Sequence, residues 1–423
     1  MQISERFRLL GADAERELAP VFRKIDGIAA ENTERVLDAF REERVSEAMF
    51  ASSTGYGYGD MGRDAIDRIA AKVFGGEAGF MRPAIICGTH ALTIGLFGLL
   101  RPGDTLLSVT GAPYDTLAEV IGTAGNPGDG SLADFGVKYA EVPLKDGDAD
   151  MAAVRNAVEA AGSSLKVVFI QRSKGYLNRK TLSTERIGEI AKSVKSWAKN
   201  EIYVVVDNCY GEFTETREPA SVGADLIIGS LIKNPGGGMA DVGGYLVGTP
   251  RAVELCGYRL CSPGIGIEAG ASLGQNRNML RGLFMAPHVV AQALKTAHFA
   301  AYVFDSLGYK VEPSPLETRY DIIQTVSLDS PEGLVGFCRG IQSASPVDSY
   351  VSPEPWAMPG YADPVVMAAG AFVGGSSIEL SADGPLRPPY TAFLQGGLTF
   401  ESGRLGILAA AECCEAARQE GKQ

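Results

Sequence analysis

The stretch SLIKNPGGG, residues 230–238, follows an apolar run at residues 226–228, and the rest of the chain can be interpreted around it. An apolar run flanked by Gly223 and Gly229 is typical of a short strand buried on both faces. Lys233 would then lie just past the carboxyl end of that strand, and the three glycines after it permit close approach because they lack Cβ atoms. A lysine in a dry pocket has a lowered pKa, and its neutral amine can form a Schiff base with a carbonyl compound. The alternative is a solvated lysine in a glycine-rich turn.

The composition is that of a soluble globular enzyme. Hydrophobic residues make up 45% of the 423 residues and charged residues 21%, the usual balance for such a protein. The net charge of −12 and the absence of a lysine or arginine block argue against a nucleic-acid partner. Seven scattered cysteines and three histidines show no metal-ligand spacing, so we expect no metal site and a reducing, cytoplasmic location. The polar amino terminus and the lack of a long apolar run predict neither a signal peptide nor a membrane association.

The order of apolar runs predicts an α/β fold. Between residues 84 and 247, short apolar runs alternate with helical segments, which indicates a mostly parallel sheet with helices on both faces. The candidate strands are residues 84–87, 105–109, 167–170, 203–206, 226–228 and 245–247. In such sheets functional groups gather at the carboxyl ends of the strands. The residues that follow each strand are therefore the candidates for a site.

The first two strands are followed by groups that suit a phosphate and a flat ring. Gly88 and Thr89 open a helix, whose free N–H groups and threonine hydroxyl can bind a phosphate; a plain threonine cap on a core helix is the alternative. Tyr114 follows the second strand, where its ring can stack on another ring; a half-buried core tyrosine is the default.

Two later strands are followed by charged groups. The polar turn QRSKGY at residues 171–176 carries two cations, Arg172 and Lys174, and can hold an oxygen of a ring or a substrate carboxylate. Asp207 ends the β-branched run at residues 203–206, where a carboxylate is costly unless a cation or donor meets it. A protonated pyridine nitrogen would be such a partner.

The segment GYGYGDMGR, residues 55–63, matches the glycine spacing of a dinucleotide-binding fingerprint. We reject that match because the residues before it are small and polar, so the strand that gives the motif its meaning is missing. Tyr56, Tyr58 and Arg63 instead form a loop that can donate hydrogen bonds to a phosphate, or an ordinary surface turn.

Together these residues form a recognisable set. The order Gly88–Thr89, Tyr114, Asp207, Ser230 and Lys233 resembles the fold-type-I enzymes that use pyridoxal 5'-phosphate. Over residues 50 to 400 the chain resembles the methionine gamma-lyase family, which also includes aluminium-resistance proteins. The strings that carry this resemblance are GYGY (55–58), RPGD (101–104), GAPYDTL (111–117), QRSKGY (171–176), SLIKNPGGG (230–238), SPVDSY (345–350), PGY (359–361), ELSADGPLR (379–387) and QGGL (395–398).

The resemblance implies a fold and three parts of the chain. The fold would be a large domain with a mostly parallel seven-stranded sheet sandwiched by helices, plus a smaller carboxyl-terminal α/β domain. The parts would be a helical arm at residues 1–50, a cofactor-binding domain at 51–284, and a bridging helix with the small domain at 285–423. The loop at residues 343–364 is a candidate lid.

The resemblance also implies roles for the residues of the set. Lys233 would carry the cofactor, Asp207 would pair with its ring nitrogen, and Tyr114 would stack on its ring. Gly88, Thr89 and Ser230 would hold the phosphate. Tyr56, Tyr58 and Arg63 would reach the site of a neighbouring subunit, so a homodimer or homotetramer with shared sites is expected. Arg387 is the first candidate for the substrate carboxylate and Arg172 the second; a surface salt bridge is the alternative for each.

The activity implied is that of a carbon–sulfur lyase. Lys233 would move the α-proton, Tyr114 or a loop tyrosine would protonate the leaving group, and the products would be a 2-oxo acid, ammonia and a thiol. A beta-lyase, a transaminase and a non-catalytic protein that binds pyridoxal phosphate are the alternatives. The sequence does not identify the amino-acid substrate, because specificity resides in loops.

Overall fold

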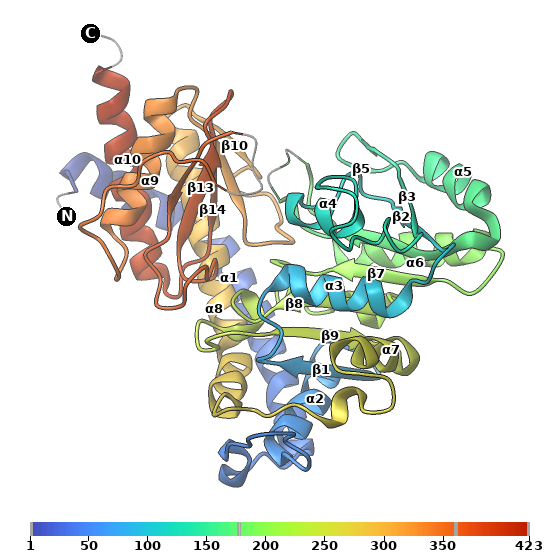
Figure 1. The fold of residues 1–423 in the computed structure, drawn as a ribbon. Coiled ribbons are helices and arrows are strands. Elements are labelled where there is room, and N and C mark those ends of the chain that lie inside the picture. The colour runs from blue at the N-terminus through green and yellow to red at the C-terminus, as the bar shows by residue number, and fades with distance from the viewer. Residues whose placement is uncertain (1–2, 176, 178, 359–362, 421–423) are drawn as a thin grey trace. The chain divides into compact units, whose positions relative to one another are not determined.

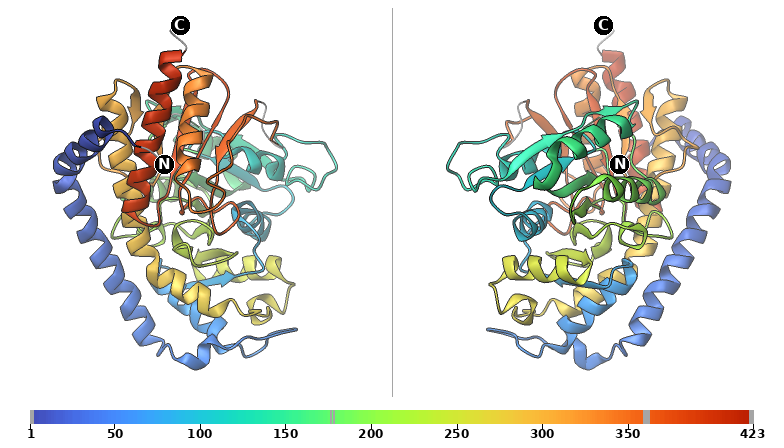
Figure 2. Two further views of the ribbon diagram at one scale, coloured as in Figure 1. Left: turned by 90° about the vertical axis from the view of Figure 1, so that its left-hand side faces the viewer. Right: turned by 90° about the vertical axis from the view of Figure 1, so that its right-hand side faces the viewer.

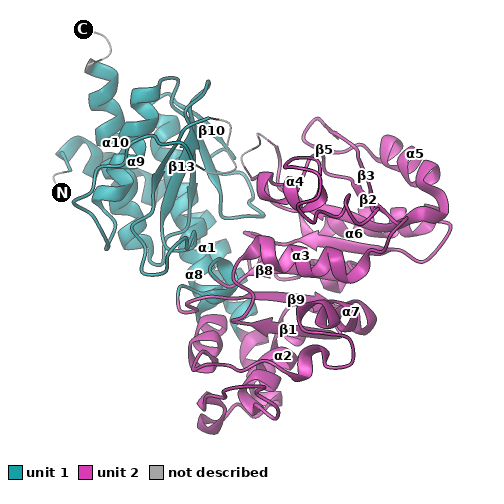
Figure 3. Ribbon diagram, viewed as in Figure 1, with its two compact units in different colours: residues 1–33, 232–238, 285–423 teal, residues 34–231, 239–284 magenta. Residues whose placement is uncertain are grey.

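The chain forms two compact units. The computed structural model describes residues 3–175, 177, 179–358 and 363–420. The first unit comprises residues 1–33, 232–238 and 285–423, and the second comprises residues 34–231 and 239–284 (Figure 3). The three-part division expected from the sequence stays a prediction. Within the described residues, no helix combines the length and the apolar character needed to cross a bilayer.

The second unit is built on a seven-stranded sheet in the order β1-β9-β8-β7-β6-β2-β3 (Figure 1). Neighbouring pairs are parallel from β3 through β8, whereas β9 runs antiparallel to both of its neighbours. The predicted mostly parallel α/β sheet is therefore confirmed. Its strands are β1 (Ala78–Arg82), β2 (Thr105–Ser108), β3 (Lys138–Glu141), β6 (Leu165–Gln171), β7 (Tyr203–Asp207), β8 (Leu226–Ser230) and β9 (Gly244–Gly248).

One predicted strand is wrong. Residues 84–87 form a turn and the lead-in to a helix, and the strand of this region is β1, six residues earlier. Phe80 and Met81 of β1 are fully buried, and β1 forms a regular antiparallel ladder with β9. Pro83 follows β1 directly and has no N–H to donate to a ladder, so the apolar residues after it do not continue the strand.

Helices cover both faces of this sheet. Apolar residues of α3, α4 and α7 pack in one cluster with alternate strand residues such as Phe169, Val205 and Ile228. The intervening residues, such as Val204 and Val206, are also fully buried, so the opposite face is covered as well. The helices are α2 (Met61–Val73), α3 (Gly88–Leu99), α4 (Asp115–Ile121), α5 (Met151–Ala161), α6 (Thr184–Trp197) and α7 (Pro250–Leu260). Short pieces are the hairpin β4 (Leu144–Lys145) with β5 (Asp148–Ala149), and the 3₁₀ turns η1 (Glu47–Phe50), η2 (Gly162–Ser164), η3 (Pro219–Val222) and η5 (Gly266–Glu268).

Side-chain caps explain where several of these helices begin. Asp150 accepts from the N–H groups of Ala152 and Ala153 at the start of α5, and Ser183 accepts from the N–H of Arg186 at the start of α6. Such caps satisfy N–H groups that have no partner within the helix.

The first unit contains an antiparallel five-stranded sheet in the order β10-β11-β14-β13-β12. Its strands are β10 (Lys310–Glu312), β11 (Gln324–Ser327), β12 (Val365–Ala368), β13 (Ser381–Pro385) and β14 (Thr391–Gln395). Its helices are most of α8 (Asn276–Ser306), α9 (Pro331–Ser343) and α10 (Phe400–Glu420), and it also holds the turn η4 (Asn234–Gly236). Buried side chains such as Phe299, Phe337 and Ile407 join these helices to the sheet in one core.

The amino-terminal arm is one long helix. A helical arm was expected at residues 1–50, and the structure has α1 (Glu5–Glu42), a single helix of 38 residues that contains Pro20 (Figure 2). Phe7, Ala14 and Leu18 of α1 are buried in the core of the first unit. Its apolar positions recur at helical spacing, which is why the segment folds against that core.

Candidate functional site

The candidate site of the second unit lies at the carboxyl edge of its parallel strands. Gln171 ends β6, Asp207 ends β7 and Ser230 ends β8, and these three strands are neighbours. Gln171 is in register with Asp207, and Asp207 with Ile228 of β8. The parallel strand order thus places Asp207 and Ser230, which were predicted, along one edge of the sheet together with Gln171, which was not. Such an edge is where functional groups gather in an open α/β sheet.

Asp207 is held in a defined position and keeps acceptor capacity. Its side chain is only 8% exposed. One carboxylate oxygen, Oδ1, accepts from the backbone N–H of Cys209 at 3.1 Å, and within the described part of the chain Oδ2 accepts no hydrogen bond. The carbonyl of Asp207 accepts from the N–H of Arg172 at 3.1 Å. A cationic N–H donor would complete this site, because a buried carboxylate needs such a partner.

The start of α3 offers a cluster of hydrogen-bond donors. Gly88 and Thr89 are its first residues, and their N–H groups have no acceptor within the helix. Cys87 caps the helix, since its Sγ accepts from the N–H of His90 at 3.4 Å. The hydroxyl of Thr89 lies 2.7 Å from that of Thr116. Two hydroxyls and two amides at one helix end suit a phosphate group.

Tyr114 lies close to this cluster. It precedes α4, and Thr116 belongs to the first turn of the same helix. The N–H of Tyr114 donates to Oε1 of Gln171 at 2.7 Å, which ties the tyrosine to the end of β6. Its side chain is half-buried. The structure therefore brings Tyr114, Thr89 and the strand ends into one region of the second unit.

Ser230 ends β8, and Lys233 follows the same strand. Ser230 is fully buried and pairs with Gly244 of β9. Lys233 comes three residues later, is half-buried and precedes the turn η4. Its segment, residues 232–238, belongs to the first unit, where a Cβ at Gly238 would lie 2.4 Å from Leu398. Glycine is thus required at Gly238, which also has a φ of +69°.

Tyr56 and Tyr58 form an exposed aromatic pair. Their rings stack with centroids 5.5 Å apart, and the side chains are 71% and 60% exposed. The loop beneath them is fixed, because the carbonyl of Tyr56 accepts from the N–H of Gly270 at 2.8 Å and Gly57 fits closely against the backbone of Gly270 and Ala271. A rigid loop therefore presents both rings to the surroundings of this chain.

Arg63 is buried beneath the same loop. Its guanidinium donates to the carbonyls of Gly57 and Gly270 at 2.8 and 3.0 Å, and to the carboxylate of Asp64. Its side chain is only 3% exposed. In this chain Arg63 therefore holds the tyrosine loop, and its expected role as a phosphate ligand stays a prediction.

Asp60 links the loop to the start of α2. It accepts from the N–H of Arg63 at 3.0 Å, from Asn276 at 2.9 Å and from the hydroxyl of Ser53. Burial raises the pKa of Asp60, but these hydrogen bonds and one from Ser272 outweigh it and lower the pKa to about 2. The loop is thus secured by an ionised carboxylate over the whole neutral range.

The two arginines proposed for the substrate carboxylate have very different surroundings. Arg387 is exposed, follows β13 and forms an ion pair with Asp363 at 3.1 Å. Arg172 is fully buried and is surrounded by protein groups, among them Glu215 at 2.7 Å. Arg387 can reach a solute without breaking a buried ion pair, whereas Arg172 cannot. Both roles stay predictions; Tyr176 and the PGY string lie outside the described residues.

Sequence reasoning missed several supporting residues. Gln171 fixes Tyr114, and Thr116 stands beside Thr89. Arg179 is buried and donates to the carbonyls of Thr110 and Ser173, which joins the loops after β2 and β6. Thr116 and Gln171 lie inside family strings, so their position in the sequence was a usable signal. Arg179 carried none, because its partners are distant backbone carbonyls.

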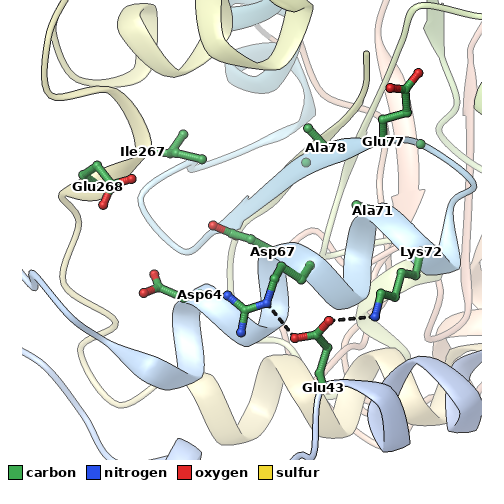
Figure 4. Close-up of a pocket in the computed structure, with 12 residues that line it drawn as sticks. Glu43, Asp64, Asp67, Ala71, Lys72, Glu77, Ala78, Ile267 and Glu268 are labelled. Atoms are coloured by element: carbon green, nitrogen blue, oxygen red, sulfur yellow. Dashed lines mark hydrogen bonds and ion pairs between the residues drawn. The ribbon is translucent and has the colours of Figure 1, made fainter. Parts of the chain in front are cut away.

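A pocket of 510 Å³ in the second unit lies beside Arg63, whose ion-pair partner Asp64 lines it (Figure 4). Its lining is rich in carboxylates, and Glu43 bridges Arg68 and Lys72 at its edge. None of the residues expected to bind the cofactor or substrate lines it. Among its other carboxylates, Asp64 pairs with Arg63 and Asp67 with Arg82. We assign the pocket no part in the chemistry.

One family model and several known proteins match this chain. A family model described as methionine gamma-lyase matches residues 8–415. The protein YnbB of Bacillus subtilis is 51% identical over 96% of each chain. The structure of a carbon–sulfur lyase involved in aluminium resistance from Clostridium novyi superposes with a TM-score of 0.93 at 48% identity and covers 99% of this chain and 96% of that one. The pyridoxal-5'-phosphate dependent protein YhfS of Escherichia coli, at 14% identity and a TM-score of 0.61, shares the fold over 91% of this chain and 96% of its own.

Proposed function

Because the chain belongs to the methionine gamma-lyase family, we propose that it is a lyase that uses pyridoxal 5'-phosphate to break a carbon–sulfur bond in an amino acid. In the proposed reaction, a sulfur-containing amino acid releases a thiol, and a 2-oxo acid and ammonia are the other products. The family match and the likeness to a carbon–sulfur lyase support it.

The residues of the second unit fit this cofactor. The donors at the start of α3 suit its phosphate, and the buried Asp207 carboxylate, with one oxygen that accepts no hydrogen bond in the described chain, suits a protonated ring nitrogen. Gly88, Thr89 and Ser230 would hold the phosphate, Tyr114 would stack on the ring, and Lys233 would hold the aldehyde carbon. The single observation that carries the proposal is the half-satisfied buried carboxylate of Asp207.

The chemistry divides between the cofactor and the chain. When bound, pyridoxal phosphate supplies a conjugated ring that takes up the electrons left behind when a bond to the substrate α-carbon breaks. Asp207 keeps the proton on the ring nitrogen, which makes the ring a better acceptor of those electrons. The Nζ of Lys233 accepts the α-proton of the substrate, and the hydroxyl of Tyr114, or of Tyr56 or Tyr58 from a second subunit, gives a proton to the departing sulfur. Arg387 is the proposed partner of the substrate carboxylate.

We propose further that the active protein is a homodimer or homotetramer in the cytoplasm, with sites shared between subunits. The exposed tyrosine pair supports sharing, because the two rings stack on each other and still stay 71% and 60% exposed, which is unusual for large aromatic side chains that serve only their own chain. The absence of disulfides among the described cysteines is compatible with a reducing compartment.

The first test is spectroscopic. The purified protein, supplied with pyridoxal phosphate, should show a visible absorption band that disappears on borohydride reduction, and peptide mapping should place the reduced adduct on Lys233. Lys174 is the control, because it also lies in a family string and its side chain is buried. No band, or an adduct on Lys174 or another lysine, would contradict the proposed site.

The second test concerns the reaction. Ammonia and 2-oxo acid should form together from L-methionine, L-cystathionine or L-cysteine. The sulfur product, a thiol or, from L-cysteine, hydrogen sulfide, should be detectable with a thiol reagent. A transaminase would release no ammonia and would require a second keto acid. A protein that only binds the cofactor would form neither product.

A further inference from the structure

Behind Asp207 lies a buried network of polar side chains centred on Arg172. The guanidinium of Arg172 donates to Oδ1 of Asn208 at 2.7 Å and to Oε2 of Glu215 at 2.7 Å, and it lies 3.5 Å from Oε2 of Glu218. It also donates to the hydroxyl of Thr184 at 3.2 Å. The arginine side chain has no exposed surface, so these groups replace its hydration.

Asn208 connects this network to the end of β7. Its side chain accepts from Arg172 and donates to Glu218 at 3.1 Å and to the hydroxyl of Tyr245 at 3.2 Å. Its N–H donates to the carbonyl of Ile228 in β8 at 2.9 Å. Asn208 directly follows Asp207, so a residue with every polar group engaged fixes the backbone next to the carboxylate.

Arg172 also acts on Asp207 through the main chain. Its N–H donates to the carbonyl of Asp207, while the following turn lets the N–H of Cys209 reach Oδ1 of the Asp207 carboxylate. The turn packs directly on the arginine, because a Cβ at Gly211 would lie 2.5 Å from Cδ of Arg172. The turn after β7 is therefore folded directly against the Arg172 side chain.

We propose that Arg172 is a positioning residue that fixes the orientation of the Asp207 carboxylate, and that it does not bind the substrate. This rests on the proposed function, in which Asp207 pairs with the ring nitrogen of pyridoxal phosphate. A planar guanidinium with partners on several sides sets the geometry of a turn in a way that the single ammonium of a lysine does not. A substrate carboxylate would have to displace Glu215 and Glu218 from a fully buried cation to reach it.

The test compares four proteins: wild type, Asp207→Asn, Arg172→Lys and Asn208→Ala. Each is titrated with pyridoxal 5'-phosphate, and the dissociation constant and the absorption maximum of the bound cofactor are recorded at one pH. The Arg172→Lys variant should bind the cofactor on the order of 10- to 100-fold more weakly, the range known for removing a group that orients a metal ligand. Its absorption maximum should shift in the same direction as that of Asp207→Asn, and Asn208→Ala should reproduce the shift.

Thr184→Val is the matched control. It removes the hydrogen bonds of the Thr184 hydroxyl with Arg172, Glu215 and the carbonyl of Arg217, but it keeps the bond from Arg172 to Asn208 and nearly the same side-chain volume. The absorption maximum should therefore stay at the wild-type position. Steady-state kinetics then separate the two roles of Arg172. A positioning role lowers kcat and leaves the KM for amino acid nearly unchanged once the cofactor is saturating. A KM that rises roughly 10- to 100-fold, the cost of losing a charge-assisted pair, with an unshifted spectrum, would overturn the proposal.

Failure of the inference and failure of the proposed function give different results. If wild type shows no cofactor band, the function is wrong. If wild type and Asp207→Asn behave as expected but Arg172→Lys and Asn208→Ala keep the wild-type spectrum and affinity, only the positioning role is wrong. If Arg172→Lys does not fold, Asn208→Ala decides, since it cuts the link and leaves the arginine with its two glutamates.

Discussion

At the scale of single residues, the structure separates groups that are poised for chemistry from groups that support them. Asp207 is buried with acceptor capacity to spare, whereas Arg172 and Arg63 are buried with their donors engaged by protein groups. The sequence alone treats all three as candidate ligands, because a motif shows the residue type and not its partners.

The most direct single-residue prediction concerns Lys233. Replacing it by Ala should lower kcat by about 10²- to 10⁴-fold, because a positioned acid–base group contributes that much to proton transfer. The measurement is ammonia release under saturating pyridoxal phosphate. Exposed Lys310, in β10, provides the control, and Lys310→Ala should retain wild-type turnover. Wild-type activity in Lys233→Ala would refute the assignment of the catalytic lysine.

Gly211 provides a prediction about packing. A methyl group there would lie 2.5 to 2.6 Å from three atoms of Arg172, so Gly211→Ala should destabilise the fold by about 1–3 kcal/mol, the usual cost of overpacking. Gly374 has open space around its would-be Cβ and an ordinary φ, so Gly374→Ala is the matched control and should be nearly neutral. Urea unfolding of both variants measures the difference, and equal midpoints would contradict the packing argument.

At the scale of elements, the core strands and the long helices follow from the sequence, and the short or exposed ones do not. Strands β6, β7 and β8 are apolar runs buried on both faces, so their pattern is unambiguous. Strand β3 is mostly exposed and carries charged residues at both ends. Its sequence therefore lacks the apolar run or alternation that would have predicted a strand. The strand expected at residues 84–87 was wrong because apolar character alone does not show which residues reach a ladder partner.

Some candidate site residues could be named from the sequence, and others could not. Residues at strand ends and helix starts are found by order along the chain, because the parallel sheet brings them to one edge. Gln171, Asn208 and Arg179 were not found, since their roles depend on which distant carbonyls and amides face them.

The loop at the start of α2 gives a prediction about pH. The folded pKa of Asp60 is about 2, below its ordinary value of 3.8, so its ionised form adds stability above pH 4 that is lost as the pH falls from about 4 to 2. Asp60→Asn should therefore be less stable than wild type at pH 7, by about 1 kcal/mol as for a weakened helix cap. Thermal unfolding between pH 5 and pH 2.5 should show the two proteins converging; a constant difference would exclude this linkage.

At the scale of the whole molecule, the main prediction is that Tyr56 and Tyr58 of one subunit act in the site of a neighbouring subunit. The Lys233→Ala protein and a Tyr56→Ala/Tyr58→Ala double variant should each have little activity. If the tyrosines act across subunits, mixing and reassociating equal amounts should restore about one quarter of the wild-type activity, since half of the dimers are hybrids with one intact site of two. No recovery would mean that the tyrosines serve their own chain. Sedimentation before and after mixing verifies that subunits have exchanged.

The cysteine that caps α3 has a further use. Cys87 is half-buried and directly precedes Gly88 and Thr89, so a phosphate bound there would stand in the path of an alkylating reagent. Cys261 is exposed and belongs to no predicted site, which makes it an internal standard for the same reagent. The ratio of labelling at the two thiols, read by mass spectrometry, should fall as pyridoxal phosphate is added. Labelling of Cys87 relative to Cys261 thereby reports how much cofactor is bound, and it needs neither substrate nor turnover.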